Sequence, residues 1–299
     1  MKRLTLGLCM AISLAASAQL ADVGRPEAIM QGTHSDLYNP VLSRDGSKLL
    51  FSAADYSNLR IYDFASGAAA TICTDARSGF DAQFTADGSE VIYVSQTDGD
   101  DGRKYRRLRS YDIARGANAN LSEPARRIER PALGSEAIDA RIDGTTRRLG
   151  KRAVSRAVRT EGSTLYITVD GNESAYSPVA SEAGYLWESL SPDGTKVMFV
   201  AAGKGIVVTD LKGNVLARPG NYEAPVWFGN DHIVAMRATD DGHQYRSSQI
   251  LLLSADGSAS QELTRPESMS MFPAASAEAG KVVYNTVDGR LYQLSVKLK

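Results

Sequence analysis

Residues 42–53 read Leu-Ser-Arg-Asp-Gly-Ser-Lys-Leu-Leu-Phe-Ser-Ala, and close copies of this stretch recur along the chain. Residues 84–95 read Phe-Thr-Ala-Asp-Gly-Ser-Glu-Val-Ile-Tyr-Val-Ser, and residues 190–201 read Leu-Ser-Pro-Asp-Gly-Thr-Lys-Val-Met-Phe-Val-Ala. Each copy places an Asp-Gly pair before a strand rich in β-branched and aromatic residues. Asp-Gly between apolar segments is a strong hairpin signal because glycine accepts a positive φ. The recurrence therefore predicts a repeat architecture built from hairpins.

The spacing of the copies predicts the number of repeats. Asp45 and Asp87 are 42 residues apart, and Asp193 and Asp231 are 38 apart. The interval of 106 residues from Asp87 to Asp193 fits two units of 53. With a weak final copy at 274–285, the count is six units of the size of a four-stranded propeller blade. The expected fold is all-β: a six-bladed propeller of four-stranded antiparallel blades.

The last unit predicts how the ring closes. Residues 273–276, 281–285 and 290–296 supply three strands, and then the chain ends. The strand-like residues 27–33 precede the first unit and have no partner within it. Because a propeller must cover the edges of its first and last blades, we expect this N-terminal strand to complete the last blade.

The repeat resembles the TolB-type, WD-repeat-like β-propellers of bacterial envelopes. The similarity rests on the Asp-Gly turn, the strand that follows it, the Tyr-Asp or Thr-Asp end of the third strand, and the Leu-Thr or Leu-Ser end of the fourth. It covers most of residues 38–298. The resemblance implies a non-catalytic binding or scaffold protein that mediates protein–protein or ligand interactions. TolB carries a further α/β domain for which this chain has no room, so TolB's own role is not implied.

The N-terminal residues predict export. Lys2 and Arg3 precede the apolar residues 4–15, and Ala16-Ser17-Ala18 forms a small-residue cleavage site. This pattern is typical of a secretory signal peptide at 1–18, followed by one propeller domain at 19–299. We therefore expect a periplasmic or secreted protein, monomeric and without a transmembrane segment. After cleavage the chain would carry 32 basic and 35 acidic residues, a balance that argues against nucleic acid as a partner.

Two segments outside the repeated hairpins resemble each other. Residues 100–106 and 240–246 both read Asp-Asp-Gly-x-x-Tyr-Arg, and both connect the second strand of a unit to the third. Their offset of 140 residues predicts loops on one face of the ring, about opposite each other. The candidate ligand-binding residues are Asp100, Asp101, Tyr105, Arg106, Asp240, Asp241, His243, Tyr245 and Arg246.

These residue types allow two interpretations. Paired carboxylates suit Ca²⁺, and tyrosine with arginine suits a peptide or a polysaccharide of the envelope. The alternative is that Asp-Asp-Gly forms turns, while the tyrosines pack on strands and the arginines face solvent. Apart from a weak indication of calcium, the sequence predicts no cofactor.

Catalysis is the competing functional hypothesis. Some propellers similar at the level of the repeat are carbohydrate-active enzymes, such as oligosaccharide lyases, that use the face at the channel mouth. His34, His232 and His243 are not at metal-ligand spacing, so no metal site is expected. The chain also lacks the short motifs of serine hydrolases, zinc proteases and phosphate loops. The sequence therefore favours a binding protein and assigns no catalytic residue.

Charge and aromatic residues add two weaker candidates. Residues 126–159 have an excess of six basic residues, which predicts either a site for an anionic envelope partner or solvated outer strands. Aromatic residues near the start of the first strand in several units either line the mouth of the channel or seal neighbouring blades. They are Tyr38, Phe80, Tyr185, Trp187 and Phe272.

Overall fold

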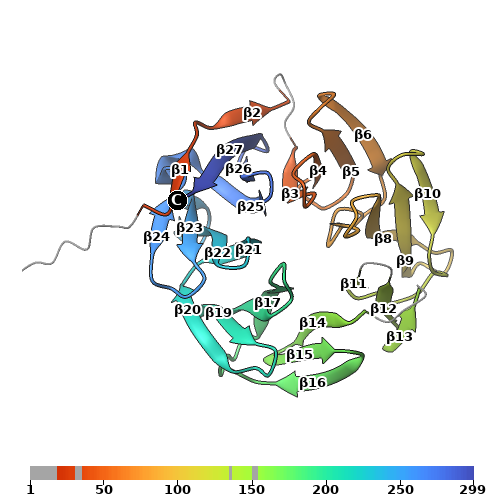
Figure 1. Cartoon of the computed structure of the whole chain (residues 1–299). Coiled ribbons are helices and arrows are strands. Elements are labelled where there is room, and N and C mark those ends of the chain that lie inside the picture. The colour runs from red at the N-terminus through yellow and green to blue at the C-terminus, as the bar shows by residue number, and fades with distance from the viewer. Residues whose placement is uncertain (1–18, 31–35, 135–136, 150–153) are drawn as a thin grey trace, which may run out of the picture.

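The chain forms a ring of seven antiparallel sheets around a central channel (Figure 1). The computed structural model describes residues 19–30, 36–134, 137–149 and 154–299. The expected signal peptide lies outside these residues. Five sheets have four or more strands, and two have three. We number the sheets as blades 1 to 7 in chain order.

Within the blades, successive strands pair as a meander that runs outward from the channel. Blade 1 contains β3 (Tyr38–Leu42), β4 (Lys48–Ser52), β5 (Leu59–Asp63) and β6 (Ala68–Cys73), and blade 2 contains β7 (Gln83–Phe84), β8 (Glu90–Asp98), β9 (Lys104–Asp112) and β10 (Ala117–Asn120). Blade 3 contains β11 (Ala132–Leu133), β12 (Ile138–Ile142) and β13 (Thr145–Arg148), and blade 4 contains β14 (Arg156–Glu161), β15 (Thr164–Val169) and β16 (Asn172–Tyr176).

The last three blades return to four or more strands. Blade 5 contains β17 (Tyr185–Leu190), β18 (Lys196–Ala201), β19 (Gly205–Asp210) and β20 (Val215–Gly220), and blade 6 contains β21 (Glu223–Phe228), β22 (His232–Asp240), β23 (Tyr245–Ser254) and β24 (Ser260–Glu262). Blade 7 contains β25 (Ser270–Ser276), β26 (Lys281–Thr286) and β27 (Leu291–Leu298), with β1 (Ala21–Val23) and β2 (Glu27–Ile29) beside β27.

The prediction of six blades is wrong, because the structure has seven. The interval from Asp87 to Asp193 holds most of blade 2 and two further blades rather than one. In the described ranges, blades 3 and 4 have three strands each, so both fit into a length that was assigned to a single unit. The prediction that every blade has four strands fails at the same place.

The expected closure by the N-terminal segment is confirmed. Ala28 of β2 lies opposite Tyr292 of β27, and Asp22 of β1 lies opposite Lys297. Ala21 and Ile29 are buried against this sheet. Two short strands, rather than one, therefore cover the outer edge of blade 7.

The innermost strand of blade 4 runs in the opposite direction to its neighbour in blade 5. Gly162, which follows β14, accepts a hydrogen bond from the backbone N–H of Tyr185 at the start of β17 (2.8 Å). Arg156, at the start of β14, reaches the turn that follows β17. By contrast, the turns after β17 and β21 lie together, where the Asp193 N–H donates to Asn230 (3.0 Å). Blade 3 has three strands among the described residues, and an odd number of strands leaves the chain on the opposite face of the ring.

Apolar clusters join neighbouring blades, and six such clusters involve the described residues. One joins blade 2 to blade 3 through Leu108 and Ile142, and another joins blade 4 to blade 5 through Ile167 and Phe199. In the part of the chain that the structure describes, none of these clusters joins blade 3 to blade 4. We call this boundary, between β11–β13 and β14–β16, the seam.

The structure contains little helix. Within the described ranges, the short 3₁₀ turn η1 (Pro266–Ser268) is the only helical element, and no helix there is long and apolar enough to cross a membrane.

Candidate functional site

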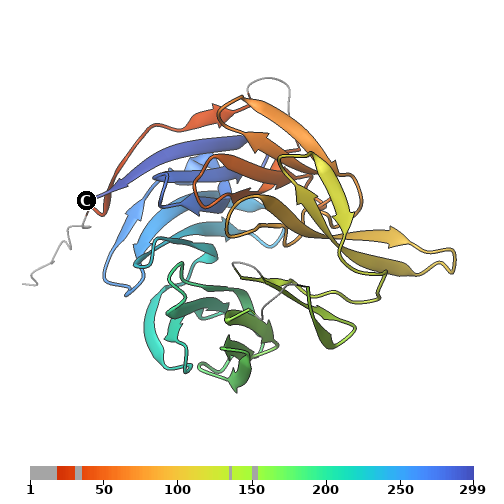
Figure 2. The same cartoon turned by 45° about the vertical axis from the view of Figure 1, so that its right-hand side comes forward.

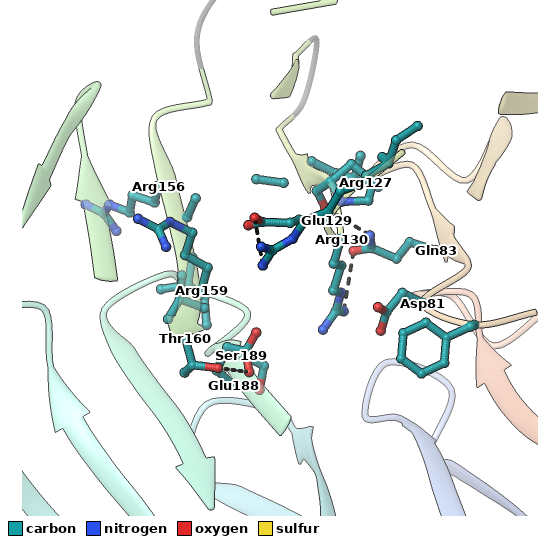
Figure 3. A pocket seen from close by; sticks show the side chains of 18 of the residues that line it. Asp81, Gln83, Arg127, Glu129, Arg130, Arg156, Arg159, Thr160, Glu188 and Ser189 are labelled. Atoms are coloured by element: carbon teal, nitrogen blue, oxygen red, sulfur yellow. Dashed lines mark hydrogen bonds and ion pairs between the residues drawn. The ribbon is translucent and has the colours of Figure 1, made fainter. Parts of the chain in front are cut away.

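A cavity of about 490 Å³ opens in the channel between blades 2, 3, 4 and 5. Figure 3 shows Arg156 and Arg159 on one wall and Arg127, Arg130, Gln83 and Asp81 on the other. Six arginines and three acidic residues line it, so its walls carry an excess of positive charge. We call it the arginine pocket. Its charged residues are Arg77, Asp81, Arg106, Arg127, Glu129, Arg130, Arg156, Arg159 and Glu188.

Two of the six arginines are neutralised by neighbouring carboxylates. Arg159 makes two hydrogen bonds to Glu173, of 2.7 and 2.9 Å, and lies 3.6 Å over the ring of Tyr166. The hydrogen bond to Glu173 raises the pKa of Arg159. Arg127 lies 3.3 Å from a carboxylate oxygen of Glu129. The Arg159 side chain is therefore held as part of the pocket wall.

The other four arginines make no ion pair with any residue that the structure describes. Their contacts with the protein are to neutral groups instead. Arg130 donates to the side-chain oxygen of Gln83 (3.4 Å). Arg156 donates to the backbone carbonyls of Asp193 (3.2 Å) and Gly194 (2.8 Å). The unpaired arginines are Arg77, Arg106, Arg130 and Arg156.

Arg77 and Arg106 crowd together on the blade 2 side. Burial is the main cause that lowers the pKa of Arg106, and the positive charges of Arg77 and Arg127 lower it further. Arg77 lies 4.2 Å over the ring of Phe80, and its buried Nε has no hydrogen-bond partner among the described residues. Like charges held close together, with an unsatisfied buried donor, favour the entry of an anion.

Asp81 is one of the three carboxylates of the pocket, and it interacts with the charges of Arg130 and Arg77. Burial raises its pKa, while the positive charges of Arg130 and Arg77 act in the other direction. The backbone of Asp81 has a φ of +60°, a conformation that aspartate and asparagine adopt more readily than most residues. The same left-handed conformation recurs beside the channel at Asn39, Trp187, Ala224 and Phe272.

The two Asp-Asp-Gly loops connect β8 to β9 and β22 to β23. Both join the second strand of a blade to the third, so they emerge on the same face of the ring. They belong to blades 2 and 6, which are three blades apart along the shorter path around a ring of seven. The predicted placement, on one face and about opposite, matches this geometry. Figure 2 shows the gold hairpin of β8 and β9 projecting beyond the ring.

Within each loop, the acidic side chains hold the turn. Asp101 accepts hydrogen bonds from the Arg103 N–H (3.0 Å) and the Tyr105 hydroxyl (2.9 Å). The backbone donor at Arg103 is the main cause that lowers the pKa of Asp101.

The second loop follows the same pattern. Asp241 accepts from the N–H groups of Gln244 and His243, which lower its pKa, and it pairs with Arg246. Asp240 accepts from the Gly242 N–H (2.8 Å), and Tyr245 is 38% exposed. Asp100 is exposed as well. Of the nine candidate binding residues, the arginine pocket includes only Arg106.

The two histidines that the structure describes lie at different ends of the β22 hairpin. His34 lies outside the described residues, His243 lies in the exposed loop of blade 6, and His232 begins β22. Burial lowers the pKa of His232. Within the described residues, no three His, Cys, Asp or Glu side chains are grouped as metal ligands would be.

The basic segment at 126–159 divides between the pocket and the surface. Arg127, Arg130, Arg156 and Arg159 line the pocket, whereas Arg147 is exposed on β13. Lys151 and Arg152 lie outside the described residues. Arg77 and Asp81 also line the pocket; they precede the first strand of blade 2, and no local motif in the sequence marks them.

The aromatic residues also divide. Tyr185 is buried in the cluster between blades 4 and 5, as the sealing interpretation predicts, and Phe272 packs against the cluster between blades 6 and 7. Phe80 lines the pocket. Trp187, next to the lining residue Glu188, is 40% exposed. Aromatic surface is therefore available at the pocket and beside it.

Comparison with known proteins shows the fold. No protein-family model and no curated protein sequence matches the chain. Among solved structures, a chain of the mitotic checkpoint complex is similar, with a TM-score of 0.61 at 10% identity, over 100% of this chain and 99% of that one.

The propeller domain of Cps50 (Swd1) from Myceliophteria thermophila has a TM-score of 0.60 at 10% identity, over 93% of this chain and 100% of its own. TolB from Acinetobacter baumannii is less similar, with a TM-score of 0.48 at 16% identity, over 76% of this chain and 54% of TolB. The first two show that the chain has a β-propeller fold.

Proposed function

We propose that the protein is an exported, monomeric, non-catalytic binding propeller whose ligand is anionic and enters the arginine pocket. The observation that carries the proposal is the set of four unpaired arginines around one cavity. A cavity of about 490 Å³ is in the size range of small-ligand pockets. Guanidinium groups suit carboxylate and phosphate because their donors match the geometry of both anions.

The surroundings of these arginines support binding rather than a structural role. Arg159 differs from them because it pairs with a carboxylate, that of Glu173. Arg77, Arg106 and Arg130 instead line the cavity without an ion pair to a described residue, and burial opposes the ionisation of Asp81, one of the three carboxylates there. The pocket therefore has positive charge in excess of what its own acids neutralise.

Titration calorimetry at low salt tests the proposal. Glutarate, citrate and inorganic phosphate should bind to the wild type, whereas neutral glycerol should not. Arg130→Gln should weaken the binding of anions by about tenfold, because it removes a charge-assisted hydrogen bond. Arg147→Gln removes the same charge from the exposed strand β13 and should leave affinity unchanged. Equal affinity of both variants for anions, or no binding by the wild type, would contradict the proposal.

Export is a separate part of the proposal, and it is supported by the sequence pattern of residues 1–18. In a bacterial host, we expect the mature protein to begin at Gln19 and to be found outside the cytoplasm. Intact mass measurement after cell fractionation checks this, and a cytoplasmic protein that retains Met1 would contradict it. Sedimentation of the mature protein tests the monomer.

A further inference from the structure

The arginine pocket lies over the seam. Its lining residues include Ile128–Leu133 on the blade 3 side and the β14 residues Arg156–Thr160 on the blade 4 side. Figure 1 shows these two blades side by side, in green. The cavity therefore spans the one boundary that, among the described residues, has no apolar cluster.

Val154, in the segment that leads into β14, contacts blade 3. The N–H of Val154 donates to a carboxylate oxygen of Asp139 (3.1 Å). Val154 is buried and lies close to Gly134 and Ala137. Apolar contacts elsewhere in the ring involve large side chains such as Leu108 and Phe199. Apolar burial is the main contribution to blade packing. Among the described residues, it therefore stabilises the seam less than it stabilises the other boundaries between blades.

Unpaired arginines lie on both sides of this seam. Arg77 and Arg106 come from blade 2, and Arg130 comes from the segment that leads into blade 3. Arg156 is the first residue of β14 in blade 4. Figure 3 shows Arg130 and Arg156 on different walls of the pocket.

The position of Arg156 is set by the reversed direction of β14. Its Nη1 donates to the carbonyls of Asp193 and Gly194, which fixes the side chain without neutralising its charge. A guanidinium has five N–H donors, so others remain available to a ligand. The cation on the blade 4 side is thus preorganised, and binding loses little side-chain entropy there.

We propose that the ligand is an elongated molecule with an anionic group at each end, and that it links blade 3 to blade 4 across the seam. This inference rests on the proposed function. One anionic end binds Arg130 with Arg77 and Arg106, and the other binds Arg156. The ligand supplies the attraction between these blades that the apolar contacts provide elsewhere in the ring.

A link of this kind changes local stability. A seam with few apolar contacts opens more readily than the rest of the ring, and a ligand that binds both sides binds only the closed form. Binding therefore shifts the seam toward the closed form. A ligand with a single anionic end occupies one side and leaves this equilibrium unchanged.

The experiment compares dicarboxylates with their monomethyl esters on the mature protein. Titration calorimetry covers the series from succinate to sebacate, and hydrogen exchange follows the amides of β12 and β14. We expect one chain length to bind best, about tenfold more tightly than its monomethyl ester. At saturation this diacid should slow exchange in β12 and β14, with no change in β23 of blade 6.

Two variants separate the ends of the ligand. Arg156→Gln keeps a donor for the carbonyls of Asp193 and Gly194 but removes the charge. It should reduce the affinity for the best diacid to that of the monoester, and leave the affinity for the monoester unchanged. Arg147→Gln is the control and should change neither.

The outcomes distinguish the two proposals. If diacid and monoester bind equally, or if exchange at β12 and β14 is unchanged at saturation, the linking role is wrong although anion binding stands. If no anion binds to the wild type, the proposed function fails and this inference fails with it.

Discussion

Arg156 donates a 2.8 Å hydrogen bond to the backbone carbonyl of Gly194, although one residue begins the inner strand of blade 4 and the other lies in the turn after the inner strand of blade 5. In a regular propeller the inner strands of neighbouring blades run parallel. The first residue of one inner strand would then lie far from the turn that follows the inner strand of the next blade. The contact therefore follows from the three-stranded blade 3, which reverses the direction of the inner strand of blade 4. It also holds the charge of Arg156 at the arginine pocket.

The first prediction concerns the N-terminal strands. A chain that lacks residues 19–30 loses β1 and β2, the burial of Ala21 and Ile29, and the hydrogen bonds from the N–H groups of Leu20 and Ala21 to Gln261. We expect a loss of roughly 3 kcal/mol or more in the free energy of unfolding. Denaturant titration measures this, with Arg25→Ala as a control on the same segment. An unchanged midpoint would show that the strands do not stabilise the ring.

The second prediction separates two costs at the Asp-Gly turns. Gly46 and Gly88 have φ values of +65° and +70°, so alanine at either position is strained by about 1 kcal/mol. A Cβ at Gly46 would also lie 2.4 Å from the Cβ of Ala279, whereas nothing lies within 4 Å at Gly88. Gly46→Ala should therefore be the more destabilising change, by roughly 1 to 2 kcal/mol. Equal denaturant midpoints would contradict the packing of this turn against blade 7.

The third prediction concerns pH. Burial raises the pKa of Asp81 above its ordinary value of 3.8, so Asp81 loses its charge as the pH falls through the raised value. Loss of this negative charge should strengthen the binding of an anion. The affinity for the anion should therefore be higher below the raised pKa of Asp81 than above it. Ethanedisulfonate is a suitable probe because it stays ionised throughout.

Asp81→Asn is the matched variant, because asparagine also accepts a positive φ. It should bind the probe more tightly than the wild type above the raised pKa, and its affinity should vary less with pH in this window than that of the wild type. Parallel pH profiles for the two proteins would show that Asp81 does not act on the site.

The fourth prediction divides the candidate residues of the Asp-Asp-Gly loops. Arg106→Ala should weaken the binding of anions, because Arg106 lines the pocket. Tyr245→Ala and Arg246→Ala should not, since both are exposed at the start of β23 in blade 6 and neither lines the pocket. Calorimetry with the same diacid measures all three. Equal losses in the three variants would restore a binding role for the loops as a pair.

Local patterns were enough to predict the propeller, its closure and the positive φ of the turn glycines, because these depend on short-range sequence. They were not enough to predict the number of blades, because the count assumed units of similar length. The pairs Asp143-Gly144 and Asp170-Gly171 indicate the correct number of blades. All four residues have a positive φ, as in a type I′ hairpin turn. Read as hairpins, these pairs indicate two short sheets in the interval assigned to one blade.

The pocket was harder to predict. The basic character of residues 126–159 was visible in the sequence, but Arg77 and Arg106 join those residues only once the blades stand in a ring. Whether an arginine is paired also depends on distant residues: Glu173 neutralises Arg159, whereas Arg130 contacts the neutral Gln83. Such differences arise from tertiary contacts and leave no pattern along the chain.

The pairing of β1 and β2 with β27 has a consequence for the order of folding. Asp22 and Lys297 are neighbours in space but lie at opposite ends of the chain. During synthesis, β1 and β2 are made first, and they cannot pair until β27 has been made. Contacts of such long sequence separation form slowly, and the unpaired strands are exposed to association with other chains in the meantime. Completion of blade 7 is therefore expected to be a late step, and a chain that stops short of β27 is expected to aggregate.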